Sequence, residues 1–126
     1  YIASHRAEMA EAYEAGLDQA LREQGGTLDA KMVFYGDYET YRNQPQQHAE
    51  QVAARVEQLM AQSDPPTAIF TTFDDEAERI YLALDRLGLR VPNDVSLVGF
   101  GGARRERRCA SCSRRGRRAR RRRPQP

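Results

Sequence analysis

The chain has 126 residues, a length that fits one domain able to bury roughly two thirds of its unfolded surface. Its net charge of +2 combines two opposite parts: residues 1–103 hold 8 Lys and Arg against 17 Asp and Glu, whereas residues 104–126 hold 12 Arg against one Glu. No apolar run approaches the ~18 residues of a membrane-spanning helix, and both cysteines lie in the basic part. These features exclude a spanning segment within the sequence and a body held together by disulfides.

Apolar residues at helical spacing predict a first helix from Ser4 that ends at Gly25. Residues 31–35 (KMVFY) are β-prone and stop at a glycine, so they predict a short buried strand. A loop over residues 36–44 then leads to Pro45, which suits the first turn of a second helix. An apolar stripe continues along that helix until the sequence SDPP ends it.

Residues 67–72 (TAIFTT) predict a second strand, and the acidic residues after it suit a helix N-terminus. Asp74 is expected to cap this third helix, which carries an apolar stripe and closes at Gly88. A turn containing a proline follows, and residues 95–100 (VSLVGF) predict a third apolar strand.

Strands that are apolar along their length and alternate with helices predict an α/β fold, in which a parallel sheet has helices on both faces as a three-layer structure. Ligands of such sheets lie beyond the carboxyl ends of the strands. The segments expected to matter for binding are therefore residues 36–44, residues 73–76 and the segment after Phe100.

The sequence PPTAIFTTFDDEAERIYLALDRLGLRVPNDVSLVGF resembles the second-lobe segment of the LacI/GalR family of bacterial transcription regulators, and VPNDVSLVGF is its most specific part. Upstream, Ala12-Tyr13 followed by Gly16-Leu17 is similar to the family pattern on the helix that opens this lobe. The resemblance spans residues 7–100.

Members of that family carry an N-terminal DNA-binding head and a two-lobed body, related to periplasmic sugar-binding proteins, that senses a small molecule and dimerises. The resemblance implies that residues 1–103 are an incomplete effector-sensing lobe of a cytoplasmic regulator, without catalysis, cofactor or metal. It implies a small-molecule effector, a second copy in the intact protein, and DNA bound through a head that this chain lacks; it implies no membrane partner. A periplasmic sugar-binding protein of a transport system is the alternative of the same fold.

Three polar positions that hold sugar hydroxyls in the family are occupied here by Met9, Phe73 and Gly101. Hydroxyls buried without partners cost roughly 1 to 3 kcal/mol each, which argues against a simple monosaccharide effector. The candidate ligand-binding residues are Tyr38, Phe73, Asp74 and Gly101. Phe73 either stacks on a ligand ring or fills the core at a strand end, and Asp74 either reaches a ligand or only caps its helix.

The two histidines, His5 and His48, flank predicted helices without a ligand-spaced partner, so surface or capping roles are expected for both. The acidic run at residues 74–78 would serve a magnesium or phosphoryl-transfer enzyme only if carboxylates converged from separate strands, usually with a lysine. Lys31, the only lysine, is predicted at the opposite end of the sheet. The enzyme hypothesis is therefore rejected.

Residues 101–126 contain no Val, Ile, Leu, Met, Phe, Tyr or Trp, so the Arg-rich tail at residues 104–126 is expected to be disordered. Its Arg, Ala, Gly, Ser, Cys and Pro are residues that GC-rich codons supply when read out of register. We interpret the tail as a shifted-frame or misassembled end. The alternative is a basic arm that binds nucleic acid through its phosphates.

Overall fold

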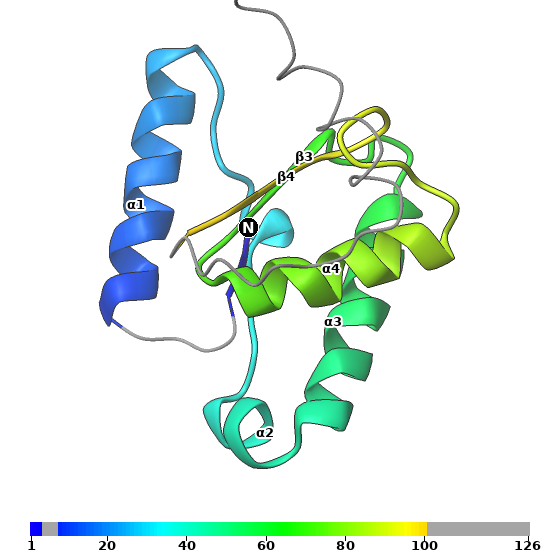
Figure 1. The fold of residues 1–126 in the computed structure, drawn as a ribbon. Helices are drawn as coiled ribbons and strands as arrows, with labels where there is room; N and C mark the ends of the chain where they lie inside the picture. The colour runs from blue at the N-terminus through cyan, green and yellow to red at the C-terminus, as the bar shows by residue number, and fades with distance from the viewer. Residues whose placement is uncertain (4–7, 101–126) are drawn as a thin grey trace, which may run out of the picture.

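A computed structural model describes residues 1–3 and 8–100 (Figure 1). The described chain forms, in order, the elements β1 (Ile2–Ala3), α1 (Glu8–Glu23), a 3-10 turn η1 (Ala30–Met32), β2 (Phe34–Tyr35), α2 (Tyr38–Asn43), α3 (Pro45–Met60), β3 (Ala68–Thr71), α4 (Asp74–Arg86) and β4 (Ser96–Gly99). None of these helices is both long and apolar enough to cross a membrane.

The strands form one parallel sheet in the order β2-β1-β3-β4. Ile2 of β1 pairs with Phe34 on one side and with Thr71 on the other, so the short first strand joins the two halves of the sheet. The pairing of β3 with β4 is longer and runs from Ala68 opposite Ser96 to Thr71 opposite Gly99. The chain crosses over through helices between successive strands, as parallel strands require.

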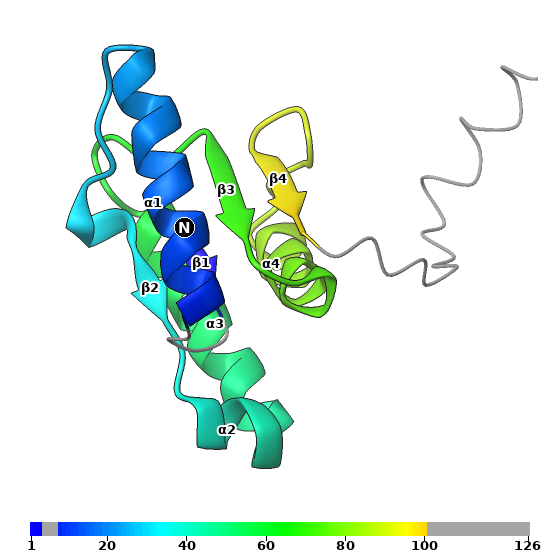
Figure 2. The ribbon, with the colours of Figure 1, turned by 90° about the vertical axis from the view of Figure 1, so that its left-hand side faces the viewer.

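The helices cover both faces of this sheet, which confirms the predicted three-layer α/β architecture. Figure 2 shows α1 in front of the sheet and α3 and α4 behind it. Behind the sheet lies the larger apolar core, whose buried members are Ile2, Val52, Val56, Leu59, Ile69, Ile80, Ala83, Leu84 and Val95. In front lies a smaller core in which Tyr1, Ala3 and Ala10 are buried against half-buried residues that include Tyr13, Leu17 and Phe70.

Two segments differ from the sequence-based expectation. The predicted strand at residues 31–35 shortens to Phe34–Tyr35, half-buried rather than buried, because Asp29 accepts a hydrogen bond from the backbone of Lys31 and caps a 3-10 turn. The predicted loop at residues 36–44 contains the helix α2, because the carboxylate of Asp37 accepts bonds from both the backbone N–H and the hydroxyl of Thr40.

The second and third predicted helices are confirmed in their extent. α3 begins at Pro45 and ends at Met60, and α4 is followed by Gly88 in the left-handed region at φ 75°, where glycine is favoured. The first helix is observed from Glu8, and its predicted start at Ser4 lies outside the described residues.

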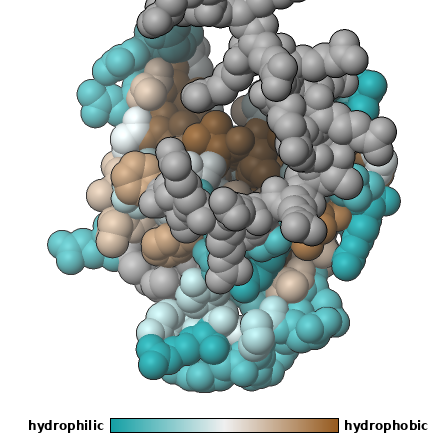
Figure 3. Space-filling view, in the orientation of Figure 1, coloured by the Kyte–Doolittle hydropathy of each residue, from teal (hydrophilic) through white to brown (hydrophobic). Residues whose placement is uncertain are grey.

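Hydrophilic and apolar surfaces are unevenly distributed. In Figure 3 hydrophilic residues gather at the lower end of the molecule, where α2 lies in Figure 1, and apolar residues show in the middle, near the sheet. The exposed large apolar side chains include Val98 on β4 and Phe100 just after it. The predicted third apolar strand is therefore present, and Val98 and Phe100 are about half covered, the latter by the Tyr13 ring at 4.8 Å between centroids.

Candidate functional site

The candidate site lies at the carboxyl edge of the parallel sheet. There β2 leads into α2 and β3 leads into α4, so the starts of both helices are brought to the same edge. This edge is where open α/β sheets bind ligands. The sequence-based site residues on these two helix starts are Tyr38, Phe73 and Asp74.

Tyr38 is the first residue of α2 and is 43% exposed. The Asp37 cap fixes the start of this helix, and the Tyr38 hydroxyl accepts a hydrogen bond of 2.9 Å from Nη1 of Arg42, one turn later. Tyr38 is thus exposed at the carboxyl edge, and its role in ligand binding stays a prediction.

Phe73 occupies the N-cap position of α4 in extended backbone, at φ −135° and ψ 149°, and is half-buried. Its side chain has no oxygen, so no side-chain bond caps this helix. The prediction that Asp74 caps α4 is wrong, because Asp74 is already the first helical residue. Its carboxylate instead lies close to Gly99 at the end of β4: a Cβ added to Gly99 would be 2.9 Å from Asp74 Oδ1.

The fourth predicted ligand residue, Gly101, lies outside the described residues, as does His5. Met9, which replaces the arginine of the family pattern, is 57% exposed on the first turn of α1. The described part of the candidate site therefore consists of two aromatic rings and one carboxylate on two helix starts at the same edge of the sheet.

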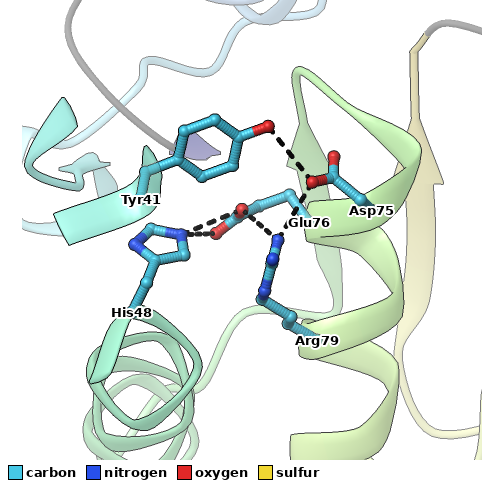
Figure 4. Close-up of polar contacts among 5 residues, drawn as sticks. All are labelled: Tyr41, His48, Asp75, Glu76 and Arg79. Atoms are coloured by element: carbon cyan, nitrogen blue, oxygen red, sulfur yellow. Dashed lines mark hydrogen bonds and ion pairs between the residues drawn. The ribbon is translucent and has the colours of Figure 1, made fainter. Parts of the chain in front are cut away.

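A buried polar pair lies inside this edge, and the sequence did not predict it. His48 Nε2 is 2.9 Å from Glu76 Oε1 and 3.0 Å from Oε2, and both side chains are fully buried (Figure 4). The expected surface or capping role of His48 is therefore wrong. The physical reason is helical register: His48 shares one face of α3 with Val52, Val56 and Leu59, the residues that this helix buries.

Further side chains, drawn in Figure 4, join this pair to the partly exposed Arg79 and Asp75. Arg79 Nη1 is 3.3 Å from Glu76 Oε2 and 3.1 Å from Asp75 Oδ2. The hydroxyl of Tyr41, on α2, donates to Asp75 Oδ2 at 3.2 Å, and its ring meets the ring of His48 edge-on at 5.3 Å between centroids. Contacts between α2 and α4 and between α3 and α4 thus meet in one cluster of five residues.

Burial raises the pKa of the Tyr41 phenol above its usual value of 10, and the neighbouring charge of Asp75 raises it further. The phenol therefore remains protonated at neutral pH and acts as a hydrogen-bond donor to Asp75. In this cluster the side chains of a histidine, a tyrosine and an arginine contact two carboxylates of α4. The cluster is thus a polar contact that joins α2 and α3 to α4.

The described residues contain no group of three or more His, Cys, Asp or Glu side chains able to hold a metal ion.

Two buried hydroxyls, those of Thr71 and Thr72 at the end of β3, have no hydrogen-bond partner in the described part of the chain. Sequence reasoning assigned both threonines only to a strand. A hollow of about 650 Å³ lies between α1 and the sheet near Pro65 and Pro66, along the start of β3 and away from the candidate site.

Comparison with known proteins identifies the fold and the family together. A family model for the periplasmic binding protein-like domain matches residues 1–110. The chain belongs to this family. It is 34% identical over 93 residues to the HTH-type transcriptional repressor PurR of Erwinia tasmaniensis and 35% identical over 92 residues to that of Pectobacterium carotovorum subsp. carotovorum. The resemblance to LacI/GalR-type transcription regulators is thereby confirmed.

A solved structure gives the same result. A protein described as a transcriptional regulator LacI from Bacillus cereus subsp. cytotoxis superposes with a TM-score of 0.66 and 28% sequence identity, over 81% of this chain and 34% of the other. The matches to the Erwinia and Pectobacterium repressors cover 74% and 73% of this chain but 25% and 24% of theirs. The chain thus spans about a quarter of the length of these curated relatives.

Proposed function

We propose that this chain is a ligand-sensing lobe of a bacterial, cytoplasmic transcription regulator, which binds a small effector at the carboxyl edge of its sheet without catalysis. The observation that carries the proposal is the placement of Tyr38 and Phe73 at the starts of α2 and α4, at the edge where parallel sheets bind ligands. Residues 1–103 supply this lobe, DNA is bound through a head domain that is not part of this chain, and the intact regulator is a homodimer.

The residues at the site favour an effector with a flat ring. Aromatic faces bind rings by stacking, and a stacked pair contributes about 0.5 to 1.5 kcal/mol beyond the area that it buries. The positions of Met9, Phe73 and Gly101 offer no side-chain amide, guanidinium or carboxylate for sugar hydroxyls. Asp74 supplies a carboxylate close to Gly99 at the end of β4, which suits a ligand with an N–H donor or a positive charge.

The alternative of a periplasmic sugar-binding protein shares this fold. The relatives named above are transcriptional repressors, and this supports the regulator over the transport protein. The VPNDVSLVGF segment, which is most typical of the regulators, forms the turn and strand next to α4 in this chain.

Calorimetric titration of the chain against plain hexoses and against planar heterocycles tests the proposal. We expect the planar compounds to bind more tightly, and Phe73→Ala to weaken their binding about tenfold, the equivalent of roughly 1.4 kcal/mol. Tyr38→Phe keeps the ring and separates stacking from hydrogen bonding, and Leu82→Ala changes an exposed apolar residue of α4 as a matched control. Tight binding of a plain hexose that Phe73→Ala leaves unchanged would refute the proposal.

A further inference from the structure

We propose that His48 is a positioning residue: in the Nε2–H form, its hydrogen bond to Glu76 holds α2, and with it Tyr38, against the start of α4. The consequence for effector binding rests on the proposed function. The structural consequence, a fixed α2, does not depend on it.

The pair lies at the point where the two halves of the candidate site meet. Gln44 is both the C-cap of α2 and the N-cap of α3, so no loop separates the two helices. His48 lies in the first turns of α3, and Glu76 is the third residue of α4, three positions after Phe73. A bond between these side chains therefore connects the segment that carries Tyr38 with the segment that carries Phe73 and Asp74.

The chemistry of the pair fixes which nitrogen carries the proton. Arg79 Nη1 donates a hydrogen bond of 3.3 Å to Glu76 Oε2, so the carboxylate of Glu76 acts as an acceptor in this cluster. His48 Nε2, at hydrogen-bond distance from both oxygens, must then be the donor. Nδ1 is buried and has no partner among the described residues, so a proton there would be a buried donor without an acceptor. The neutral Nε2–H form leaves only a bare nitrogen at that position.

Loss of the pair should act locally. The rest of α3 and α4 remains joined by apolar contacts in the larger apolar core, where Val52, Val56, Ile80 and Leu84 are buried. α2 has only six residues, and besides its junction with α3 its described ties include the bond of Tyr41 to Asp75 and the edge-on contact of Tyr41 with the His48 ring. Without His48, Tyr41 loses its ring contact, and Glu76 keeps only Arg79 as a donor within this cluster. The start of α3 and the whole of α2 should open more easily than the rest of the fold.

Two substitutions separate the hydrogen bond from the bulk of the ring. The side-chain nitrogen of His48→Gln is as many bonds from Cα as Nε2 and can reach Glu76, whereas the nitrogen of His48→Asn corresponds to Nδ1 and cannot. His48→Leu keeps the volume and removes the donor. Glu57→Gln changes an exposed residue on the opposite side of α3 and serves as the control.

Amide hydrogen exchange of the whole chain, resolved by residue, gives the decisive measurement. We expect His48→Leu and His48→Asn to speed exchange in residues 38–48 about tenfold or more relative to Leu59, with His48→Gln much closer to the parent and Glu57→Gln unchanged. Ring ¹⁵N spectra of the parent should show a protonated Nε2 and a bare Nδ1. Should His48→Leu not fold, the comparison of His48→Gln with His48→Asn still tests whether the hydrogen bond to Glu76 holds α2.

Equal exchange in the Gln and Asn variants, unchanged exchange in residues 38–48 of His48→Leu, or a proton on Nδ1 would overturn the proposal. None of these measurements requires an effector, so a failure of the proposed function is seen separately, as an absence of binding in the parent chain. Where a planar compound binds the parent, His48→Asn should weaken its binding by the ratio of the fraction of molecules with α2 in place in the parent to that fraction in the variant, whereas His48→Gln should largely preserve binding.

Discussion

Gly99 is the position where a single methyl group should have the clearest effect on the candidate site. It lies at the end of β4 under the first turn of α4, and a Cβ added there would be 2.9 Å from Asp74 Oδ1 and 3.2 Å from the Cβ of Ala77. The Asp74 carboxylate can rotate away, but Ala77 is fixed by the helix backbone. Gly99→Ala must therefore push the start of α4 away from the sheet by a few tenths of an ångström.

The expected cost follows from overpacking of a helix against a sheet, about 1 to 2 kcal/mol. For a domain of this size such a loss lowers the melting temperature by roughly 5 to 15 °C, measurable by circular dichroism or scanning calorimetry. Gly16→Ala is the matched control, because Gly16 lies in α1 with no atom within 4 Å of an added Cβ. At that helical position Ala should stabilise the chain by up to about 1 kcal/mol.

The two glycine substitutions should therefore change stability in opposite directions. Combining Gly99→Ala with Asp74→Ala should recover the part of the loss that comes from the carboxylate and leave the part that comes from Ala77. A Gly99→Ala chain as stable as the parent, with the spectrum of a folded protein, would show that α4 is not held tightly over β4 and would refute the reasoning.

Two further predictions concern the turn before β4 and the basic tail. The side chain and the backbone N–H of Arg90 donate hydrogen bonds to Asp94 and lower the pKa of its carboxyl to about 2. The stability that Asp94 contributes should therefore be complete above its ordinary pKa of 3.8 and be lost as the pH falls toward 2. Asp94→Asn should flatten the acid side of the curve of stability against pH, and an unchanged curve would contradict this. For residues 104–126, re-reading the coding DNA in the other two frames from about Gly102 onward should restore apolar strand and helix patterning, whereas finding no such frame would favour a genuine nucleic-acid-binding arm.

Most of the fold was predictable where the apolar pattern is local and long. The stripe from Val52 to Leu59 and the proline at its start predicted α3 to within a few residues, and the run TAIFTT predicted β3, because each segment carries its own periodicity. β1 carries no such pattern, since two residues, Ile2 and Ala3, cannot show alternation. They form a strand only because β2 and β3, both distant in sequence, offer backbone partners on either side.

The short helix α2 was missed for a different reason. Residues 36–44 contain Gly, Asp, Asn and few apolar side chains, a composition typical of loops. The signal was nevertheless present, because Asp37 stands three residues before Thr40, whose backbone N–H and hydroxyl it caps. A single capping carboxylate can start a helix, and the average composition of nine residues does not reveal it.

The buried pair at the site shows how such a contact can be predicted from sequence. His48 precedes Val52 and Val56 by four and eight residues, and Glu76 precedes Ile80 and Leu84 by four and eight, so each polar side chain continues the buried stripe of its helix. A buried carboxylate without a partner is too costly to retain, at several kcal/mol. A histidine and a glutamate on the buried faces of two helices that cover the same side of a sheet therefore predict their own contact. The helical stripes place both residues inside, and burial then favours a contact between them.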